Sequence, residues 1–480
     1  MTKKIKYYSS DDLGAPVLKQ AGWGSMVNLY RQICVGYNEQ EVESILYSID
    51  DKTVTISCTI KEHGYRKYQT LLINAPGTQY HEKEFFIIKT GSNTLICQTK
   101  ELFTEELISG NITCKVAPIG MIEELTDNVG KSAFKFEDPD GENVYMVIND
   151  TQPTQFVWNN TNMMAPASIY MCKNLDDIDG DSDYTMPYNH SYPNAHKISE
   201  WKPGSDTAWS YGLGKIMYQN TLSTGNAQTN NINLNVSWKI IGNGSFHYLY
   251  IYPNSYYDSG VVAALYFFGA LKRKYEFDKY AYVIKFTYNY SEYTTSNANF
   301  YNIAGGTLVS TLNYNNFNAT ITCNISTAIK YSQLKFSYNR SVAPNKITDS
   351  LIEYDTLIMK GLTSENRQAI YAYPSKYTVS TGSGLSDQKY PNFDGSVSLS
   401  KINIYEHGDN IERGTLPGAL WIHHNAPFAN KVIYKFINDD NKDFYAICMQ
   451  NISMTGVGGT SSSYSYFLPT ILISFDEEDW

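Results

Sequence analysis

Four aspartates alternate with other residues in one short acidic segment, and their spacing is the clearest chemical signal in the chain. They are Asp177, Asp179, Asp181 and Asp183. Carboxylates that converge from a loop suit Ca²⁺, which takes six to eight oxygen ligands in a flexible geometry. An EF-hand loop beginning at Asp177 would require glycine and glutamate where the chain has Ser182 and Tyr188. The segment therefore predicts either a calcium site or a solvated acidic turn, and Ca²⁺ is the one cofactor that the sequence suggests.

Two adjacent histidines, His423 and His424, are the next candidates for metal binding. Neighbouring residues on a strand point to opposite faces of the sheet, so they rarely share one ion. A metal would need further ligands from elsewhere, such as His407 or Asp439. Packing or hydrogen bonding is the expected role of this pair.

The motifs of common enzymes are missing from the sequence. No Gly-x-Ser-x-Gly nucleophile elbow occurs. The glycine-rich segment 456–460 resembles a phosphate-binding loop, but no lysine follows it. The acidic residues 476–479 are typical of a solvated charge run. We therefore expect no catalytic residues and no enzymatic activity.

The composition is that of a globular protein rich in aromatic residues. Among 480 residues there are 41 tyrosines and 20 phenylalanines, enough apolar surface to offset the ordering entropy of folding. The formal net charge of −10 gives no electrostatic reason to bind nucleic acid. One basic triplet, residues 272–274, is more typical of a solvated turn.

Targeting and redox signals are weak. The basic N-terminal segment lacks the apolar region of a signal peptide, and no apolar run approaches the roughly 18 residues of a membrane-spanning helix. The longest apolar run, 261–271, predicts a buried strand instead. The seven cysteines are widely spaced with no Cys-x-x-Cys pair, which favours reduced, buried thiols.

One helix is predicted near the N-terminus, within residues 11–37. Apolar residues recur there at intervals of three to four positions, from Val17 onward. Ser25 is the expected N-cap and Gly36 the expected end, which gives a helix over 25–35. We expect this helix to pack on the first β-layer.

Alternating apolar and polar residues predict strands along the rest of the chain. Hairpins are expected between 134–136 and 143–148, and across the turn Gly242-Asn243-Gly244. The predicted fold is mainly β, with two or more antiparallel sandwich-like or barrel-like units and one short N-terminal amphipathic helix. The expected domains are a helix plus β-domain for docking (1–118), a loop-rich region with the acidic loop (119–230), an exposed Tyr/Asn-rich β-domain (231–400) and a C-terminal β segment (401–480).

The opening of the chain resembles a widespread family of tailed-bacteriophage virion proteins. In that family, Gly-Ala-Pro-x-Leu leads into a Gly-Ser-initiated helix that ends near Cys-x-Val-x-Gly. This chain carries the corresponding segments 12–18, 24–26 and 33–37, followed in order by 112–118, 246–249, 266–269, 280–281, 414–421 and Trp480. Val35, Asn38 and residues 422–424 depart from the pattern, and 285–400 carries no matching segment.

The resemblance implies a structural protein of a phage particle, made in the host bacterial cytoplasm and assembled into a neck, collar, tail or head-fibre element. It implies homo-oligomers and other virion proteins as partners. The expected assembly interface is the apolar face of the helix and the preceding arm: Leu18, Met26, Leu29, Tyr30 and Ile33. The alternative is a receptor-binding protein for a host surface glycan, or a tailspike glycosidase, since tyrosine and tryptophan with asparagine suit sugar binding as well as protein interfaces.

Overall fold

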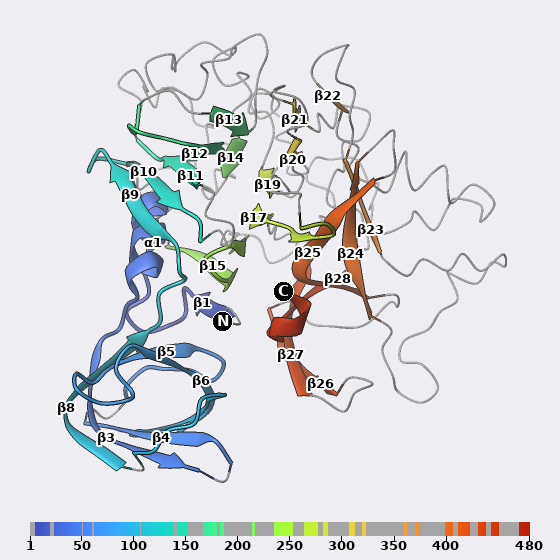
Figure 1. Cartoon of the computed structure of the whole chain (residues 1–480). Coiled ribbons are helices and arrows are strands. Elements are labelled where there is room, and N and C mark those ends of the chain that lie inside the picture. Colours follow the sequence, from blue (N-terminus) through green and yellow to red (C-terminus); the bar gives the residue numbers. More distant parts are fainter. Residues whose placement is uncertain are drawn as a thin grey trace, which may run out of the picture.

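Antiparallel sheets make up most of the protein (Figure 1). The computed structural model describes residues 5–19, 24–49, 51–59, 62–105, 107–137, 143–151, 167–179, 183–186, 214–216, 235–252, 264–276, 282–286, 307–312, 319–322, 360–361, 370–374, 399–406, 411–422, 431–437, 443–450 and 470–480. These residues form one closed barrel, three open sheets and one α-helix. The predicted fold class is confirmed.

The barrel is the first complete unit along the chain and projects from the rest of the molecule (Figure 1). Its strands close in the order β3-β4-β7-β6-β5-β8. They are β3 (Gln40–Ser48), β4 (Thr53–Cys58), β5 (Thr70–Asn74), β6 (Lys83–Thr90), β7 (Thr94–Gln98) and β8 (Leu107–Val116). In β4, buried residues alternate with half-buried ones. This alternation of period two places one apolar row in the barrel interior and leaves the other row on the outer wall.

A nine-stranded sheet forms the centre of the molecule. Its strands are β1 (Lys6–Ser9), β2 (Leu18–Lys19), β15 (Asn235–Gly242), β16 (Phe246–Tyr252), β17 (Ala264–Ala270), β19 (Tyr282–Phe286), β20 (Thr307–Leu312), β21 (Ala319–Thr322) and β22 (Lys360–Gly361). Residues 246–251 are all buried, as are Tyr266, Phe267 and Phe268. Such continuous apolar runs indicate strands that are covered on both faces.

The other two sheets and the helix supply that cover. The six-stranded sheet contains β9 (Ile122–Thr126), β10 (Lys131–Lys135), β11 (Val144–Asn149), β12 (Ala167–Lys173), β13 (Asp183–Met186) and β14 (Gly214–Ile216). The seven-stranded sheet contains β18 (Lys272–Arg273), β23 (Ile370–Pro374), β24 (Leu399–Glu406), β25 (Ile411–Ile422), β26 (Ile433–Ile437), β27 (Asp443–Gln450) and β28 (Thr470–Ser474). His247 of β16 packs on Phe136 beside β10, whereas Tyr248 packs on Trp480 beyond β28. Consecutive residues of β16 thus face opposite covers.

The single described helix, α1 (Ser25–Val35), has the predicted bounds and ends at Gly36, whose φ of 86° favours glycine. One expectation about it was wrong: Leu18 belongs to the short strand β2 and not to the helical pattern. The helix packs mainly on β2, β9 and β11.

The predicted N-cap was also wrong, for a physical reason. The N-cap residue is Gly24, which has no side chain, and Ser25 is already the first helical residue. Asp150, which follows β11, takes over the capping role. Its carboxylate Oδ2 accepts the Met26 backbone N–H at 2.8 Å, and its carbonyl accepts the Gly24 N–H at 2.8 Å. A carboxylate at this end also interacts favourably with the helix dipole.

Both predicted hairpins are confirmed by strand pairing. Phe134 of β10 lies opposite Met146 of β11, and Trp238 of β15 lies opposite Ile251 of β16. The turn of the second hairpin is held by the Asn243 side chain, which accepts the Ser245 and Phe246 backbone N–H groups. The expected domain boundaries stay predictions. Strand pairing does cross all three of them, because β1 pairs with β15 and β18 pairs with β25.

The cap from a distant residue gives a testable expectation. Asp150→Ala should lower the free energy of unfolding by about 1–2 kcal/mol, because the Met26 N–H loses its acceptor. Asp150→Asn keeps an acceptor oxygen and should recover most of that loss. The comparison is made by urea unfolding followed by tryptophan fluorescence and circular dichroism. Equal losses in the two variants would contradict a capping role.

Candidate functional site

The described carboxylates of the acidic segment, Asp177 and Asp179, contact other groups of this chain. Asp177 Oδ1 accepts the Asp179 backbone N–H at 3.0 Å, which closes a turn. The Asp179 carboxylate pairs with the Lys131 ammonium, which is 1% exposed. Asp181 and the side chain of Asp183 lie outside the described residues. Among the residues described, no group of three or more potential ligands comes together, so the calcium site stays a prediction.

Other candidates from the sequence fall outside the described residues. These are the histidines His423, His424 and His407, the carboxylate Asp439 and the glycine-rich segment 456–460. The basic triplet 272–274 is described. Lys272 Nζ donates to the Glu478 backbone carbonyl near the C-terminal end of the chain. That lysine therefore binds the chain's own backbone.

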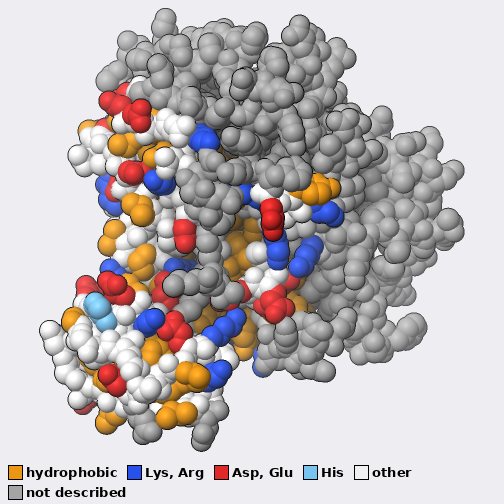
Figure 2. All heavy atoms as spheres, viewed as in Figure 1, with side chains coloured by type: hydrophobic (Ala, Val, Ile, Leu, Met, Phe, Trp, Pro, Cys, Tyr) orange, Lys and Arg blue, Asp and Glu red, His pale blue; other side chains and the backbone are white. Residues whose placement is uncertain are grey.

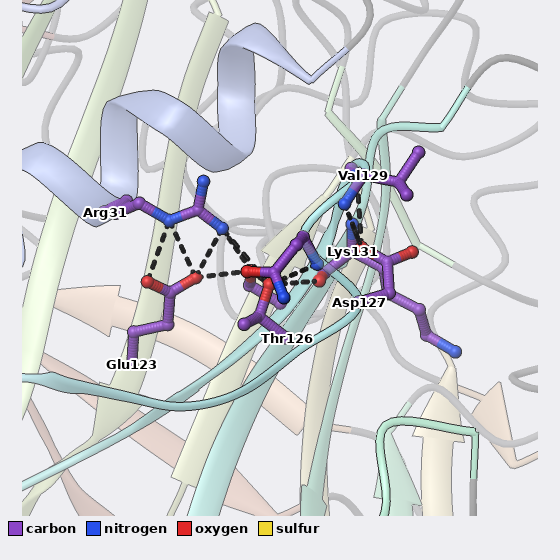
Figure 3. A network of polar contacts seen from close by, with 9 residues as sticks. Arg31, Glu123, Thr126, Asp127, Val129 and Lys131 are labelled. Carbon is purple, nitrogen blue, oxygen red and sulfur yellow. Dashed lines mark hydrogen bonds and ion pairs between the residues drawn. The ribbon is translucent and has the colours of Figure 1, made fainter.

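A network of polar contacts joins α1 to the six-stranded sheet (Figure 3). Arg31 on α1 makes a two-pronged ion pair with Glu123 on β9, with Nε 2.8 Å from Oε2 and Nη2 2.7 Å from Oε1. Ser132 Oγ donates to Glu123 Oε1 at 2.6 Å, and Arg31 Nη2 also lies 3.1 Å from Thr126 Oγ1. Partial burial acts to raise the pKa of Glu123, but the hydrogen bonds from Arg31 and Ser132 lower it overall.

The chemistry of this network favours anchoring over catalysis. A carboxylate held ionised by a guanidinium is a poor proton acceptor, because its pKa lies far below neutral pH. Next to it, Asp127 Oδ1 accepts the backbone N–H groups of Val129, Gly130 and Lys131 at 2.8, 3.0 and 2.8 Å (Figure 3). The network therefore fixes the β9–β10 turn and seats the helix on it.

A second polar cluster forms where the N-terminal arm meets the mouth of the barrel. Asp12 Oδ2 accepts the Ser9 backbone N–H and the Tyr37 hydroxyl, both at 2.9 Å. Its other oxygen, Oδ1, lies 3.8 Å from Arg66 Nε on the barrel's β4–β5 loop. Burial raises the pKa of Asp12, and the hydrogen bonds from Tyr37 and Ser9 oppose that shift. This one carboxylate connects the arm, the end of the helix and the barrel.

A buried histidine lies between the helix and the central sheet. His247 Nε2 is 3.0 Å from the Tyr30 hydroxyl, and no described residue hydrogen-bonds to Nδ1. Phe136 and Phe268 pack against its ring. Burial lowers the pKa of His247 to about 3, so the ring is neutral at physiological pH. No carboxylate among the described residues contacts it, and a neutral packing role follows.

Trp480 packs on the opposite face of the same sheet. Its ring contacts Phe246 and Tyr248, and its Nε1 donates to the Ser474 carbonyl at 2.7 Å. Gly418 on β25 permits this close packing, since a Cβ there would lie 2.2 Å from Trp480 Nε1 and the φ of Gly418 is 67°. The acidic residues before Trp480 are paired rather than only solvated. Lys100 of the barrel binds Glu477 at 2.8 Å, and Lys401 of β24 lies 3.7 Å from Asp479.

The residues expected to form an assembly interface lie in the core. All five are 0% exposed: Leu18, Met26, Leu29, Tyr30 and Ile33. An amphipathic pattern cannot tell whether the apolar face packs inside the chain or on another subunit. Here β2, β9, β11 and the ring of His247 cover it, so this expectation is corrected.

The described cysteines agree with the expectation of reduced, buried thiols. Six are free, and all but the half-buried Cys34 are buried. Burial raises the pKa of Cys34 and of Cys97, which makes those thiols poor nucleophiles.

Sequence reasoning missed Asp12, Asp150 and the Arg31–Glu123 pair as organising residues. Their partners lie far away in the chain, 92 residues in the case of Arg31 and Glu123 and 124 residues in the case of Met26 and Asp150. No local spacing reports such contacts. Asp12 and Arg31 do lie in segments with a sequence signal, 12–18 and the predicted helix 25–35, but that signal does not identify their partners.

No protein-family model matches the chain, and no curated protein matches its sequence. No described helix is both long and apolar enough to cross a bilayer.

The neutral histidine predicts a pH-dependent stability. The pKa of His247 is about 3 in the folded chain and about 6.5 when unfolded, so the unfolded chain gains a proton first as the pH falls. Stability should therefore fall by about 1.4 kcal/mol per pH unit below pH 6.5 from this residue alone. His247→Phe should flatten the slope, whereas Tyr30→Phe, which keeps the histidine, should not. Urea unfolding between about pH 4 and pH 7 measures both; equal slopes in wild type and His247→Phe would contradict the assignment.

The tryptophan on the other face predicts a second loss of stability. Trp480→Ala should lower the unfolding free energy by about 2–4 kcal/mol, because it opens a gap against the central sheet. Trp480→Phe keeps a ring but loses the bond to Ser474, and about 1 kcal/mol should be lost. Urea unfolding of the three proteins tests this order. Equal unfolding free energies for wild type and Trp480→Ala would show that packing of the Trp480 ring does not stabilise the fold.

Proposed function

We propose that the protein is a structural component of a tailed-bacteriophage virion, assembling as an oligomer in a neck, collar, tail or head-fibre element. The observation that supports the proposal is the arrangement in space of the segments that carry the resemblance. Several of the segments through which the sequence resembles phage virion proteins are far apart in the chain but contact one another around the central sheet, within the part that the structure describes.

The first set of contacts joins the end of the helix to the end of the barrel. A Cβ on Gly36 would lie 2.3 Å from the Val116 carbonyl, so these two segments pack backbone to backbone. The Ile119 N–H donates to the Ile33 carbonyl at 2.9 Å, and the Tyr8 hydroxyl donates to the Ala117 carbonyl at 2.7 Å. The segments 33–37 and 112–118 thus lie side by side.

The second set joins the central sheet to the C-terminal end. The φ of Gly269 is 128°, and a Cβ there would lie 2.2 Å from the Ser245 carbonyl. The Tyr248 hydroxyl donates to the Pro417 carbonyl at 2.7 Å, and Trp480 packs on Gly418. Each contact requires a glycine or one specific side chain. A motif built from such residues is typical of a protein whose role depends on its shape.

The polar networks support the same role. Arg31, Asp12 and the acidic residues before Trp480 each tie elements together that lie far apart in sequence. An assembly component needs this rigidity, because a preorganised surface loses less entropy when it binds its neighbours.

The test is to locate the protein in purified particles. Particles of the phage that encodes this chain should contain it at a fixed copy number by quantitative mass spectrometry. Gold-labelled antibody should mark one position on the particle. A non-virion protein of the same phage, measured in parallel, controls for carry-over from the lysate. Abundance in infected cells together with absence from purified particles would overturn the proposal.

A second assay tests the alternative function, which is binding or hydrolysis of a host surface glycan. Host surface polysaccharide is incubated with the purified protein, and released reducing ends are measured. A structural component should produce none above a boiled-protein control. Turnover of the polysaccharide would favour a tailspike glycosidase, and binding without turnover would favour a receptor-binding protein.

A further inference from the structure

The largest group of exposed apolar side chains on any one described unit lies at one end of the barrel. Four residues there are half or more exposed: Leu46 (52%), Ile49 (50%), Leu102 (69%) and Leu107 (63%). We call them the barrel patch. Figure 2 shows apolar side chains on the outer surface of this part of the molecule, at the lower end of the view. Isolated exposed leucines need no explanation, but a cluster of them marks an interaction surface.

Strand register places two residues of the patch, Leu46 and Leu107, side by side on the outer wall. Ile96 on β7 lies opposite Thr55 on β4, and Thr55 lies opposite Leu46 on β3. Leu46 in turn lies opposite Leu107 on β8. The described neighbours of each along its strand are buried, so Ile96, Thr55, Leu46 and Leu107 point outward and form one row across four strands.

The loop between β7 and β8 extends the row. The Tyr47 hydroxyl donates to the Glu101 carbonyl at 3.4 Å, and the rings of Tyr47 and Phe103 lie 5.3 Å apart. These contacts hold Leu102 at the same end of the barrel as Leu46 and Ile49. The apolar residues thus sit on fixed backbone and form a preorganised surface.

The barrel's closure limits how a partner can bind. All six strands are paired on both sides, so there is no free edge to which another strand could add. A partner must lie flat against the outer wall. The four side chains would contribute on the order of 400 Å² of apolar area per copy. That is about half of one side of a standard interface, with the polar rim supplying the rest.

The charges beside the patch favour a second copy of this chain. Asp51 and Lys52 are exposed neighbours in the β3–β4 turn and carry one charge of each sign. A two-fold axis that passes between these two residues would bring Asp51 of one copy opposite Lys52 of the other. A strongly acidic or strongly basic partner would instead be matched by residues of one charge sign around the patch.

We propose that the barrel patch is a self-association surface, through which two copies of this chain pack barrel wall to barrel wall about a two-fold axis. The proposal deepens the proposed function, on which it rests for its setting in a phage particle. It places homo-oligomer contacts on the projecting barrel and away from the buried helix.

The experiment is sedimentation velocity of the full-length purified chain over a range of concentrations. Wild type should show a monomer–dimer equilibrium. Leu46→Lys and Leu107→Lys should each weaken it at least tenfold in Kd. Val129→Lys is the matched control, because Val129 is 79% exposed, lies outside the patch and makes the same change in charge. Each of the three lysine variants changes the net charge from −10 to −9, so a difference between the patch variants and Val129→Lys does not come from net charge.

Salt dependence gives an independent measurement. Two copies with a charge of −10 repel one another, and salt screens that repulsion while leaving the apolar contact in place. Dimerisation should therefore strengthen between about 0.05 M and about 0.5 M NaCl.

A wild-type chain that stays monomeric at all concentrations would overturn the proposal. So would equal weakening by Leu46→Lys and Val129→Lys. Circular dichroism and thermal melting check that the variants are folded. These outcomes are read without phage particles, so a failed patch leaves the virion role standing. Conversely, a chain that dimerises but is absent from particles would contradict the virion role alone.

Discussion

The central strands β16 and β17 must be covered on both faces, and the rest of the architecture follows from this requirement. Their side chains are apolar or aromatic on either side, so exposure of either face would leave a broad apolar surface in water. One cover is α1 with the six-stranded sheet, and the other is the seven-stranded sheet with Trp480. Both come from segments far from β16 in the chain. The fold therefore depends on long-range contacts, and the two ends of the sequence lie close together, with Tyr7 of β1 packing on Phe475 after β28 (Figure 1).

Buried charges follow from the same crowding. Lys6 on β1 pairs with Glu84 on the barrel at 2.7 Å, and Lys239 on β15 donates to the Tyr7 hydroxyl at 2.7 Å. A buried ammonium without a partner would be strongly destabilising, so each such lysine requires a partner at a defined position. Polar contacts of this kind select one arrangement of the layers. Apolar contacts alone would tolerate small shifts between them.

Local patterns in the sequence predicted much of the local structure. The helix over 25–35, its end at Gly36 and the hairpin around Asn243 depend on neighbouring residues, and all three are confirmed. Contacts made between distant segments were beyond such reasoning. Asp150 caps the helix because β11 ends beside it, a fact that no spacing near Ser25 could reveal. For the same reason, the apolar face of α1 could not be assigned to the core or to an interface until its covering strands were known.

The barrel is joined to the rest of the chain at one narrow place. The chain enters the barrel just after Tyr37 and leaves it at Val116, and the Val116 N–H donates to the Tyr37 carbonyl at 2.9 Å. Entry and exit are therefore adjacent, as at the junction of an inserted domain. A short turn between Tyr37 and Val116 would therefore span the gap that removal of the barrel leaves. Away from this junction, the barrel is tied to the rest of the chain by side chains, among them Arg66 beside Asp12 and Lys100 on Glu477.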